Sequence, residues 1–563
     1  MAVARKEGSR IERVYQSFRG ADFRGEEINL VRSPDCLNVW KDYKETDSIR
    51  TRPGMELVSG FDAPVYGIHF FGGEMLVHSG TELHRITDDG RELLYSGMNA
   101  AHSRGFLYEG IWYIQDGANY LQYDGKKVSG VVGYIPTTTI ARKPGGGGTV
   151  YQDVNMLSDL RKNSFLADGK STEYVLDTMS IDSDYTPVVT VGGEKMDSAL
   201  YHVDYVAGRI TFVYAPAAPL TDGQDNVIIQ FKKTIPDHRK TIEECTLTQV
   251  FDNRVFFSGN KNKPNMLWHC SIDDPTYVSD LDYYREGMDT AAIHGIVAGN
   301  NALWVFREPS DANTTVFYHT PTIDQEYGKI YPSVHSSITT GCIGKAINFN
   351  DDIVFFSARG MEGTSGDVTT EQVVSHRSTV VDRKLTAESR YADMLLEEWE
   401  GYLLVFIGDH CYLADSRGMY TNGNHVEYEW FYWDMGKEIL CTRVERGVLY
   451  LGTADGVYSL TDADAHMESY WVTPKDKFGN PSRLKTTNKR GCVAEATGDI
   501  SVYAKLEDTD FEHIGTYEGV EDYFVSRIKR KKFKDIQLKF YSTTRFSLET
   551  VTLEAFIGGY IKR

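Results

Sequence analysis

A basic run near the C-terminal end is the strongest local charge anomaly in the sequence. It places six cations between residues 527 and 534 of a chain whose formal net charge is −20. If the run forms a strand, charged side chains alternate along both of its faces, so both faces cannot be buried. We therefore predict an exposed edge strand protected by its lysines, or a surface that docks on an acidic protein, in preference to DNA. The candidate docking residues are Arg527, Lys529, Arg530, Lys531, Lys532 and Lys534.

Motifs for nucleophilic or metal-assisted hydrolysis are missing from the sequence. It contains neither Gly-x-Ser-x-Gly nor His-Glu-x-x-His. Acidic pairs such as Asp351-Asp352 and Glu397-Glu398 are adjacent in the chain, so on a strand they point to opposite faces and cannot form a glycosidase pair. His410-Cys411 is interpreted as one outward and one inward residue of a strand. We predict that the protein is not an enzyme and has no catalytic residue.

Sequence motifs that could form a phosphate or metal site are better explained by turns and linkers. The glycine run 145–148 is not followed by Gly-Lys-Ser/Thr, so we interpret it as a linker. The acidic clusters 222–226 and 462–464 have oxygen ligands but fit no twelve-residue calcium loop, and Asx turns explain them. Seven cysteines stand singly without Cys-x-x-Cys, which argues against a disulfide framework and a structural zinc site. We predict no cofactor and no metal.

Composition favours a β-rich protein of several domains. The 563 residues include 51 Gly, 35 Tyr and 26 Phe, with 41% hydrophobic and 25% charged residues. No apolar stretch is long enough for a transmembrane helix, and the first residues resemble no signal peptide, so we expect no membrane segment and folding in a cytoplasm. The acidic balance opposes non-specific binding to DNA.

A repeated unit organises most of the chain. Residues 439–460 are typical of three short strands joined by tight turns at Arg446-Gly447 and Asp455-Gly456. The same pattern, a turn residue before an apolar run, recurs six more times. The seven aligned turn residues are Gly73, Gly110, Asn253, Asn301, Asp352, Gly401 and Gly447. Their intervals are 37, 143, 48, 51, 49 and 46 residues, which apart from one match the blades of a β-propeller. Unrelated hairpins in a sandwich are the alternative.

The fold that we predict is all-β: a six- or seven-bladed β-propeller with an inserted small β-sandwich and a C-terminal β domain. The long interval locates the insert. The predicted parts are an N-terminal arm at 1–60, the propeller at 61–145 and 237–468, the insert at 146–236, and the C-terminal β domain at 469–563. Within the insert we expect five strands, and a helical turn at 155–163 before them. The five strands are expected at 173–176, 187–191, 201–205, 209–213 and 226–231.

Three short N-terminal strings, at 15–23, 32–39 and 50–54, resemble in their order the opening of tail-hub proteins of tailed bacteriophages. That group includes packaged-DNA stabilisation proteins and tubular nozzle proteins of short-tailed phages. The strings at 155–165 and 208–212 also look like phage virion sequences. Together with the propeller repeat, the resemblance covers most of the chain.

The resemblance implies a virion protein of the tail, made in the host bacterial cytoplasm, that forms a ring, commonly a hexamer. Such a ring continues the channel of the portal and adaptor proteins, carries tail fibres or spikes, and retains or conducts the genome. No catalytic residue is carried over from this family. A lumen lined with carboxylates would let genomic DNA slide without sequence recognition. The alternatives are a glycan-binding or glycan-cleaving propeller and a host-receptor adhesin.

Overall fold

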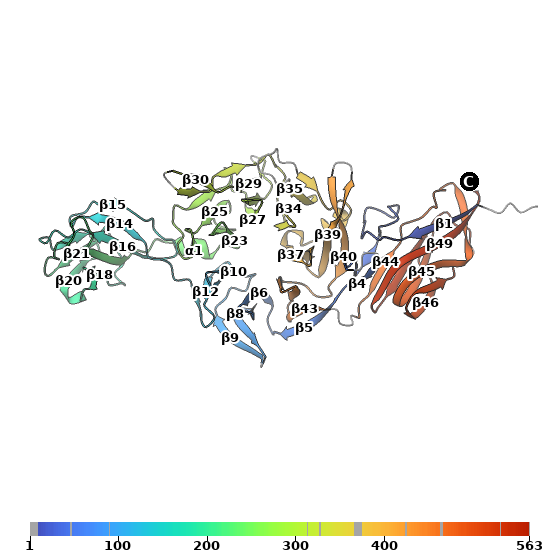
Figure 1. Cartoon of the computed structure of the whole chain (residues 1–563), viewed down its shortest axis with the longest axis horizontal. Helices are drawn as coiled ribbons and strands as arrows, with labels where there is room; N and C mark the ends of the chain where they lie inside the picture. The colour runs from blue at the N-terminus through green and yellow to red at the C-terminus, as the bar shows by residue number, and fades with distance from the viewer. Residues whose placement is uncertain are drawn as a thin grey trace, which may run out of the picture. The chain divides into compact units, whose positions relative to one another are not determined.

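The structure is a computed structural model, nearly all β-strand, with two short α-helices, α1 (His238–Glu243) and α2 (Asp382–Leu385), in the part it describes (Figure 1). It describes residues 9–44, 48–88, 90–311, 314–325, 328–364, 374–422, 425–461, 466–529 and 531–561. The chain folds as two compact units. One consists of Met1–Phe70, Met75–Gly80 and Ser336–Arg563, and the other of Phe71–Glu74 and Thr81–His335.

Seven antiparallel sheets of four strands follow one another along the described chain. Six of them are built from strands β6 (Val65–Phe71), β7 (Glu74–Ser79), β8 (Glu82–Thr87) and β9 (Gly90–Ser96); β10 (Arg104–Tyr108), β11 (Ile111–Gln115), β12 (Tyr120–Tyr123) and β13 (Val128–Gly130); β23 (Leu247–Phe251), β24 (Arg254–Ser258), β25 (Met266–His269) and β26 (Tyr283–Arg285); β27 (Ile293–Gly299), β28 (Ala302–Arg307), β29 (Val316–His319) and β32 (Ser333–His335); β33 (Ala346–Phe349), β34 (Asp352–Ser357), β35 (Gly360–Thr364) and β36 (Val374–His376); and β37 (Leu395–Trp399), β38 (Tyr402–Ile407), β39 (His410–Asn422) and β40 (His425–Asp434).

The seventh sheet joins segments from distant parts of the chain. Strands β41 (Cys441–Glu445), β42 (Val448–Gly452) and β43 (Gly456–Thr461) are completed by β5 (Gly54–Gly60), which pairs with β43. Strands β30 (Thr322–Asp324) and β31 (Gly328–Ile330), which precede β32 in the chain, form a separate two-stranded sheet. Four-stranded meanders in succession, with the last completed by a strand that precedes the first, are the arrangement of a β-propeller. The predicted fold class is confirmed.

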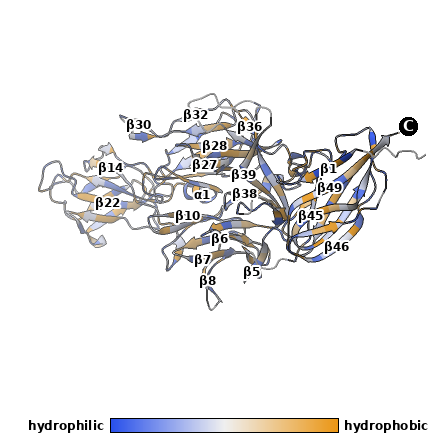
Figure 2. Ribbon diagram, turned by 45° about the vertical axis from the view of Figure 1, so that its right-hand side comes forward, coloured by the Kyte–Doolittle hydropathy of each residue, from blue (hydrophilic) through white to orange (hydrophobic). Residues whose placement is uncertain are grey.

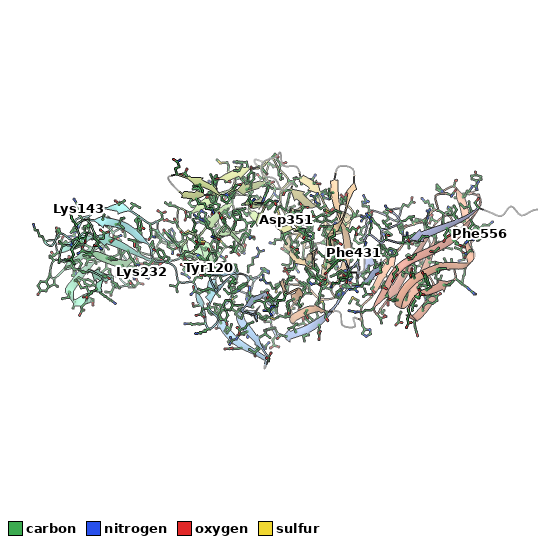
Figure 3. The ribbon with its side chains drawn as sticks, viewed as in Figure 1. Tyr120, Lys143, Lys232, Asp351, Phe431 and Phe556 are labelled. Carbon is green, nitrogen blue, oxygen red and sulfur yellow. The ribbon has the colours of Figure 1, made fainter. Side chains whose placement is uncertain are left out.

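The first hairpin of each sheet explains the sequence repeat. Its two turn residues both have positive φ, the geometry of a type I′ turn, which glycine and asparagine adopt most readily. The seven turn pairs are Gly72-Gly73, Glu109-Gly110, Asp252-Asn253, Asn300-Asn301, Asn350-Asp351, Glu400-Gly401 and Arg446-Gly447. The alignment at Asp352 was one residue late, since β34 begins there and Asp351, labelled in Figure 3, is the turn residue.

Two further sheets form the inserted β-sandwich. The larger contains β15 (Thr149–Val150), β14 (Thr137–Arg142), β16 (Leu160–Phe165), β22 (Val227–Lys232), β18 (Val188–Val191) and β19 (Glu194–Lys195), and the smaller contains β17 (Glu173–Val175), β21 (Arg209–Phe212) and β20 (Tyr201–Asp204). Buried side chains from both sheets, Phe165, Tyr174 and Phe231 among them, share one core. All five strands expected from the sequence are present.

Around these strands the insert differs from its sequence prediction. Its first strand begins at Thr137, and the glycine run expected to be a linker is the turn between β14 and β15, with positive φ at residues 146–148. No helix forms at 155–163. There, Met156 and Leu157 instead belong to a core that includes Tyr113 and Tyr120 of the propeller. The segment between β15 and β16 therefore packs against the propeller.

The N-terminal segment differs most from its prediction as an arm. Four of its strands enter the C-terminal sheet: β1 (Arg10–Tyr15), β2 (Cys36–Leu37), β3 (Val39–Trp40) and β4 (Ile49–Thr51). The other six strands of that sheet are β44 (Ser469–Val472), β45 (Arg483–Leu506), β46 (Glu512–Val520), β47 (Tyr523–Ser526), β48 (Ile536–Ser542) and β49 (Phe546–Tyr560). Hydrophobic and hydrophilic residues alternate along strands such as β45 (Figure 2). The alternation buries one face and exposes the other.

Candidate docking site

The basic run lies in the loop between β47 and β48, so the prediction that it forms a strand is wrong. Two apolar side chains hold this loop against the domain: Ile528 and Phe533 are 7% and 1% exposed. Phe533 also exchanges two backbone hydrogen bonds with Lys485, with N–O distances of 2.8 and 3.0 Å. Apart from the isolated bridge between Phe533 and Lys485, the described residues of the run pair with no strand.

A buried lysine fixes the far end of the loop. The ammonium of Lys485, which is fully buried, donates to the carbonyl oxygens of Asn480 at 2.6 Å and Lys534 at 2.7 Å. Burial lowers the pKa of Lys485, and the charges of Asp535 and Asp476 oppose this effect. The loop is thus tied by its backbone at one end and by Ile528 near the other.

The cations between these anchors face solvent. Arg527, Lys529, Lys531, Lys532 and Lys534 are all exposed, whereas Arg530 lies outside the described residues. Lys531 lies 3.3 Å from a carboxylate oxygen of Glu512, and Lys534 lies 3.9 Å from one of Glu507. For Arg527, Lys529 and Lys532 the described part of the chain supplies no ion-pair partner.

Charge is distributed unevenly along the chain. Residues 469–563 contain 17 Lys and Arg against 13 Asp and Glu, although the whole chain has 60 against 80. The C-terminal segment is therefore net positive by four, and the remainder is net negative by 24. The exposed loop therefore lies in the net-positive part of an acidic chain.

The acidic and histidine pairs considered from the sequence make contacts within the fold. Asp352 accepts from Arg377 at 2.8 Å and from Tyr428, so it is part of a structural network. Glu397 accepts from Thr442 at 2.9 Å, while its neighbour Glu398 is exposed. The Nδ1 atom of His410 lies 3.0 Å from Glu388, and burial raises the pKa of the adjacent Cys411 thiol.

Metal-binding clusters are not found either. Among the described residues no group of three or more His, Cys, Asp and Glu side chains could hold a metal ion. The cluster at 462–464 lies outside the described residues. The absence of enzymatic activity stays a prediction.

One carboxylate–histidine cluster was missed by the sequence analysis. His376 lies 2.6 Å from Asp382 through Nε2 and 3.3 Å from Glu362 through Nδ1. Burial lowers the pKa of His376, but the hydrogen bonds to Asp382 and Glu362 outweigh it and raise the value to about 9. The hydroxyl of Ser378 donates to Asp382 at 2.6 Å and not to the imidazole. A protonated histidine between two carboxylates is an ion-pair centre, not a general base.

The N-terminal strings of the family resemblance build a junction within the first unit. Phe18 packs edge-on against Trp471 with ring centroids 5.2 Å apart. Gly20 has a φ of +78°, and a Cβ there would collide with the carbonyl oxygen of Trp430. The hydroxyl of Ser33 donates to the carbonyl of Val472 at 2.7 Å. These residues connect the N-terminal segment to β40 and β44.

Asn38 and Arg52 complete this junction. Asn38 accepts from Arg52 at 3.0 Å and from the backbone N–H of Asp434 at 2.8 Å, and it donates to the carbonyl of Glu468 at 2.8 Å. The Arg52 guanidinium also donates to the carbonyls of Pro53 and Asp434. Arg52 is 4% exposed, and burial lowers its pKa to about 10. Its planar fork therefore serves neutral oxygen acceptors inside the protein.

Replacing Arg52 by lysine should lower the free energy of unfolding by about 1–2 kcal/mol, because one ammonium cannot reach all three acceptors. Urea unfolding followed by tryptophan fluorescence measures this loss. The matched control is Arg446→Lys, since the Arg446 side chain is 80% exposed and its replacement should be nearly neutral. Equal effects of the two replacements would contradict the assigned role of Arg52.

The described chain contains no helix with the length and apolarity needed to cross a membrane.

Comparisons with known proteins leave the function open. No protein-family model matches the chain, and no curated protein matches its sequence. Among solved structures, it is similar to BamB from Moraxella catarrhalis at 10% identity, a TM-score of 0.32, and coverage of 72% of this chain and 96% of that one. It is also similar to Kluyveromyces lactis Hsv2 at 8% identity, a TM-score of 0.25, and coverage of 66% and 97%. Likenesses this weak carry no argument about function.

Proposed function

We propose that this protein is a structural virion component of a bacteriophage tail, a nozzle or hub ring that continues the portal and adaptor channel. The resemblance of the N-terminal strings to tail-hub proteins supports this proposal. Residues of these strings, such as Gly20, Asn38 and Arg52, make architectural contacts in the junction, which fits a structural role.

The observation that carries the docking part of this proposal is the fixed cationic loop on an acidic chain. Its backbone is held by Lys485 and Phe533 while its cations face solvent. In the ring, this loop would contact an acidic face of the neighbouring copy or of the adaptor protein. Because such contacts involve exposed charges, they weaken as the Debye length falls from about 10 Å at 0.1 M salt to about 3 Å at 1 M.

Reversing Lys529, Lys531 and Lys532 to glutamate should abolish assembly while the protein remains folded, since all three side chains are exposed. Native mass measurement at 0.1 M salt is expected to give a ring for the unaltered protein and a monomer for the triple variant. Raising the salt to 1 M should dissociate the ring of the unaltered protein as well.

In the matched control, glutamate replaces Lys126, Lys127 and Lys195, which are exposed and lie in the other unit. It changes the net charge by the same amount and should leave assembly intact. A triple loop variant that still forms rings would show that the loop is only solvated. A monomeric unaltered protein that depolymerises a polysaccharide would overturn the structural role altogether.

A further inference from the structure

The strand that leads into the basic loop is an edge of its sheet. In the described chain β46 and β47 each pair with β45 alone, so β47 has no strand on its other side. The registered pairs in β47 are Tyr523 with Glu495, Phe524 with Ala494, Val525 with Val493, and Ser526 with Cys492. An unpaired strand edge presents a row of backbone donors and acceptors to any extended segment that approaches it.

The hydrogen-bond phase shows which groups point outward. The N–H of Ala496 donates to the carbonyl of Asp522 at 2.8 Å. In an antiparallel pair of strands, hydrogen-bonded residue pairs alternate with non-hydrogen-bonded pairs. Because Asp522 is bonded to β45, Phe524 and Ser526 also direct their backbone groups towards β45, and Tyr523 and Val525 direct theirs away from it. The carbonyl of Val525 accordingly accepts a hydrogen bond from the Tyr517 hydroxyl at 2.9 Å, whereas its N–H is directed to the open edge.

Side-chain exposure continues the same period of two into the loop. Phe524 and Ile528 are buried, while Tyr523 and Val525 are 61% and 45% exposed. The next outward positions are Arg527 and Lys529, both exposed. One continuous strip therefore begins apolar and ends cationic, beside an open backbone edge.

We propose that an extended acidic segment of a partner protein adds as a strand to the outer edge of β47. Its backbone bonds to the outward groups of Tyr523 and to the outward N–H of Val525, its apolar side chains cover these two residues, and its carboxylates meet Arg527 and Lys529. Strand addition takes affinity from main-chain hydrogen bonds and specificity from alternate side chains. This inference rests on the docking role proposed above and names the chemistry of the partner.

Proline at position 525 provides a selective test. It removes only the N–H that faces the open edge, and proline is tolerated on an edge strand in that orientation. The probe is a fluorescent blocked heptapeptide of alternating glutamate and valine, titrated at 0.1 M salt. Val525→Pro should weaken its binding at least tenfold, and Arg527→Glu with Lys529→Glu should do the same. Amide exchange at Tyr523 and Val525 should slow when the peptide binds.

Two comparison probes separate the sources of affinity. A lysine–valine heptapeptide should not bind, and a 20-base-pair DNA duplex should bind more weakly than the acidic peptide. Unchanged binding by Val525→Pro, with unchanged unfolding, would overturn strand addition. Tighter binding of the duplex would assign the strip to nucleic acid. If the triple loop variant loses its rings while Val525→Pro keeps peptide affinity, only this inference fails and the proposed function stands.

Discussion

Replacing Glu286 by alanine should lower the free energy of unfolding by about 1–3 kcal/mol, the usual cost of leaving buried polar groups without their partner. Oε1 of Glu286 lies 3.0 Å from Nε2 of His319, and both side chains are completely buried. Oε2 of Glu286 accepts from the hydroxyl of Ser333 at 2.7 Å. The other imidazole nitrogen of His319 lies 2.9 Å from the carbonyl of Tyr331. Removal of the carboxylate thus leaves the buried imidazole of His319 without its neighbouring carboxylate and the half-buried Ser333 hydroxyl without its acceptor.

Urea unfolding monitored through the fluorescence of Trp268 and Trp304, which lie in the two sheets that meet at this pair, measures the effect. The matched control is Glu82→Ala, because Glu82 also contacts a histidine, His84 at 3.0 Å, but has a side chain that is 47% exposed. Its loss should cost less than about 1 kcal/mol. A Glu286→Ala variant as stable as this control would contradict the argument.

The second large effect concerns the free energy of unfolding between pH 6.5 and 4. Two buried groups each change it by about 2–3 kcal/mol in this range, in opposite directions, so the unaltered protein shows little of either change. Burial, with the charge of Arg254 second, lowers the pKa of His269 to about 4. Burial raises the pKa of Asp282 to about 6, with Asp153 and Asp280 adding to the rise and Arg254 opposing it. Arg254 lies 2.9 Å from Nδ1 of His269.

These two groups act in opposite directions on acidification. As the pH falls from 6.5 to 4, the unfolded state binds more protons at His269, so stability is lost. As it falls from 6 to about 3.9, the folded state binds more protons at Asp282, so stability is gained. The two contributions nearly cancel in the unaltered protein.

Single replacements should therefore reveal slopes of opposite sign. From pH 6.5 to 4, and relative to the unaltered protein, His269→Gln should become more stable by about 3 kcal/mol and Asp282→Asn less stable by about 2 kcal/mol. The double variant is the control, and its profile should follow that of the unaltered protein. Urea unfolding at half-unit pH steps provides the profile. Parallel profiles for the two single variants would refute the assignment.

The repeat of the propeller could be found from the sequence because it depends on local chemistry. Each type I′ turn needs two residues with positive φ, and residues such as Gly73, Asn253 and Asn301 adopt it at low cost. The apolar run after each turn forms a central strand; in β38, for example, every residue is buried. Turn and strand signals therefore coincide at the same positions seven times.

Long-range pairing left no comparable signal. Strands β2 and β3 have two residues each, too few for an alternation to be recognised, and in β5 all residues but Gly54 are exposed or half-exposed. The partners of β2 and β5, which are β44 and β43, lie hundreds of residues away, so only the tertiary fold defines them. The loop at 527–534 was misjudged for a related reason. Its cations indicated a solvent-facing edge, but burial of Ile528 and Phe533 was decided by the surrounding sheet.

Pairing of the first strands with the last ones has a consequence for biosynthesis. Arg10 of β1 pairs with Phe556 of β49, and Gly54 of β5 pairs with Thr461 of β43. At the usual 5–20 residues per second, the ribosome needs roughly 0.5–2 minutes to deliver the partner of β1 after β1 itself has been made. During this interval these strands have exposed edges and no native partner, so the first unit completes its sheets only after β49 has been synthesised.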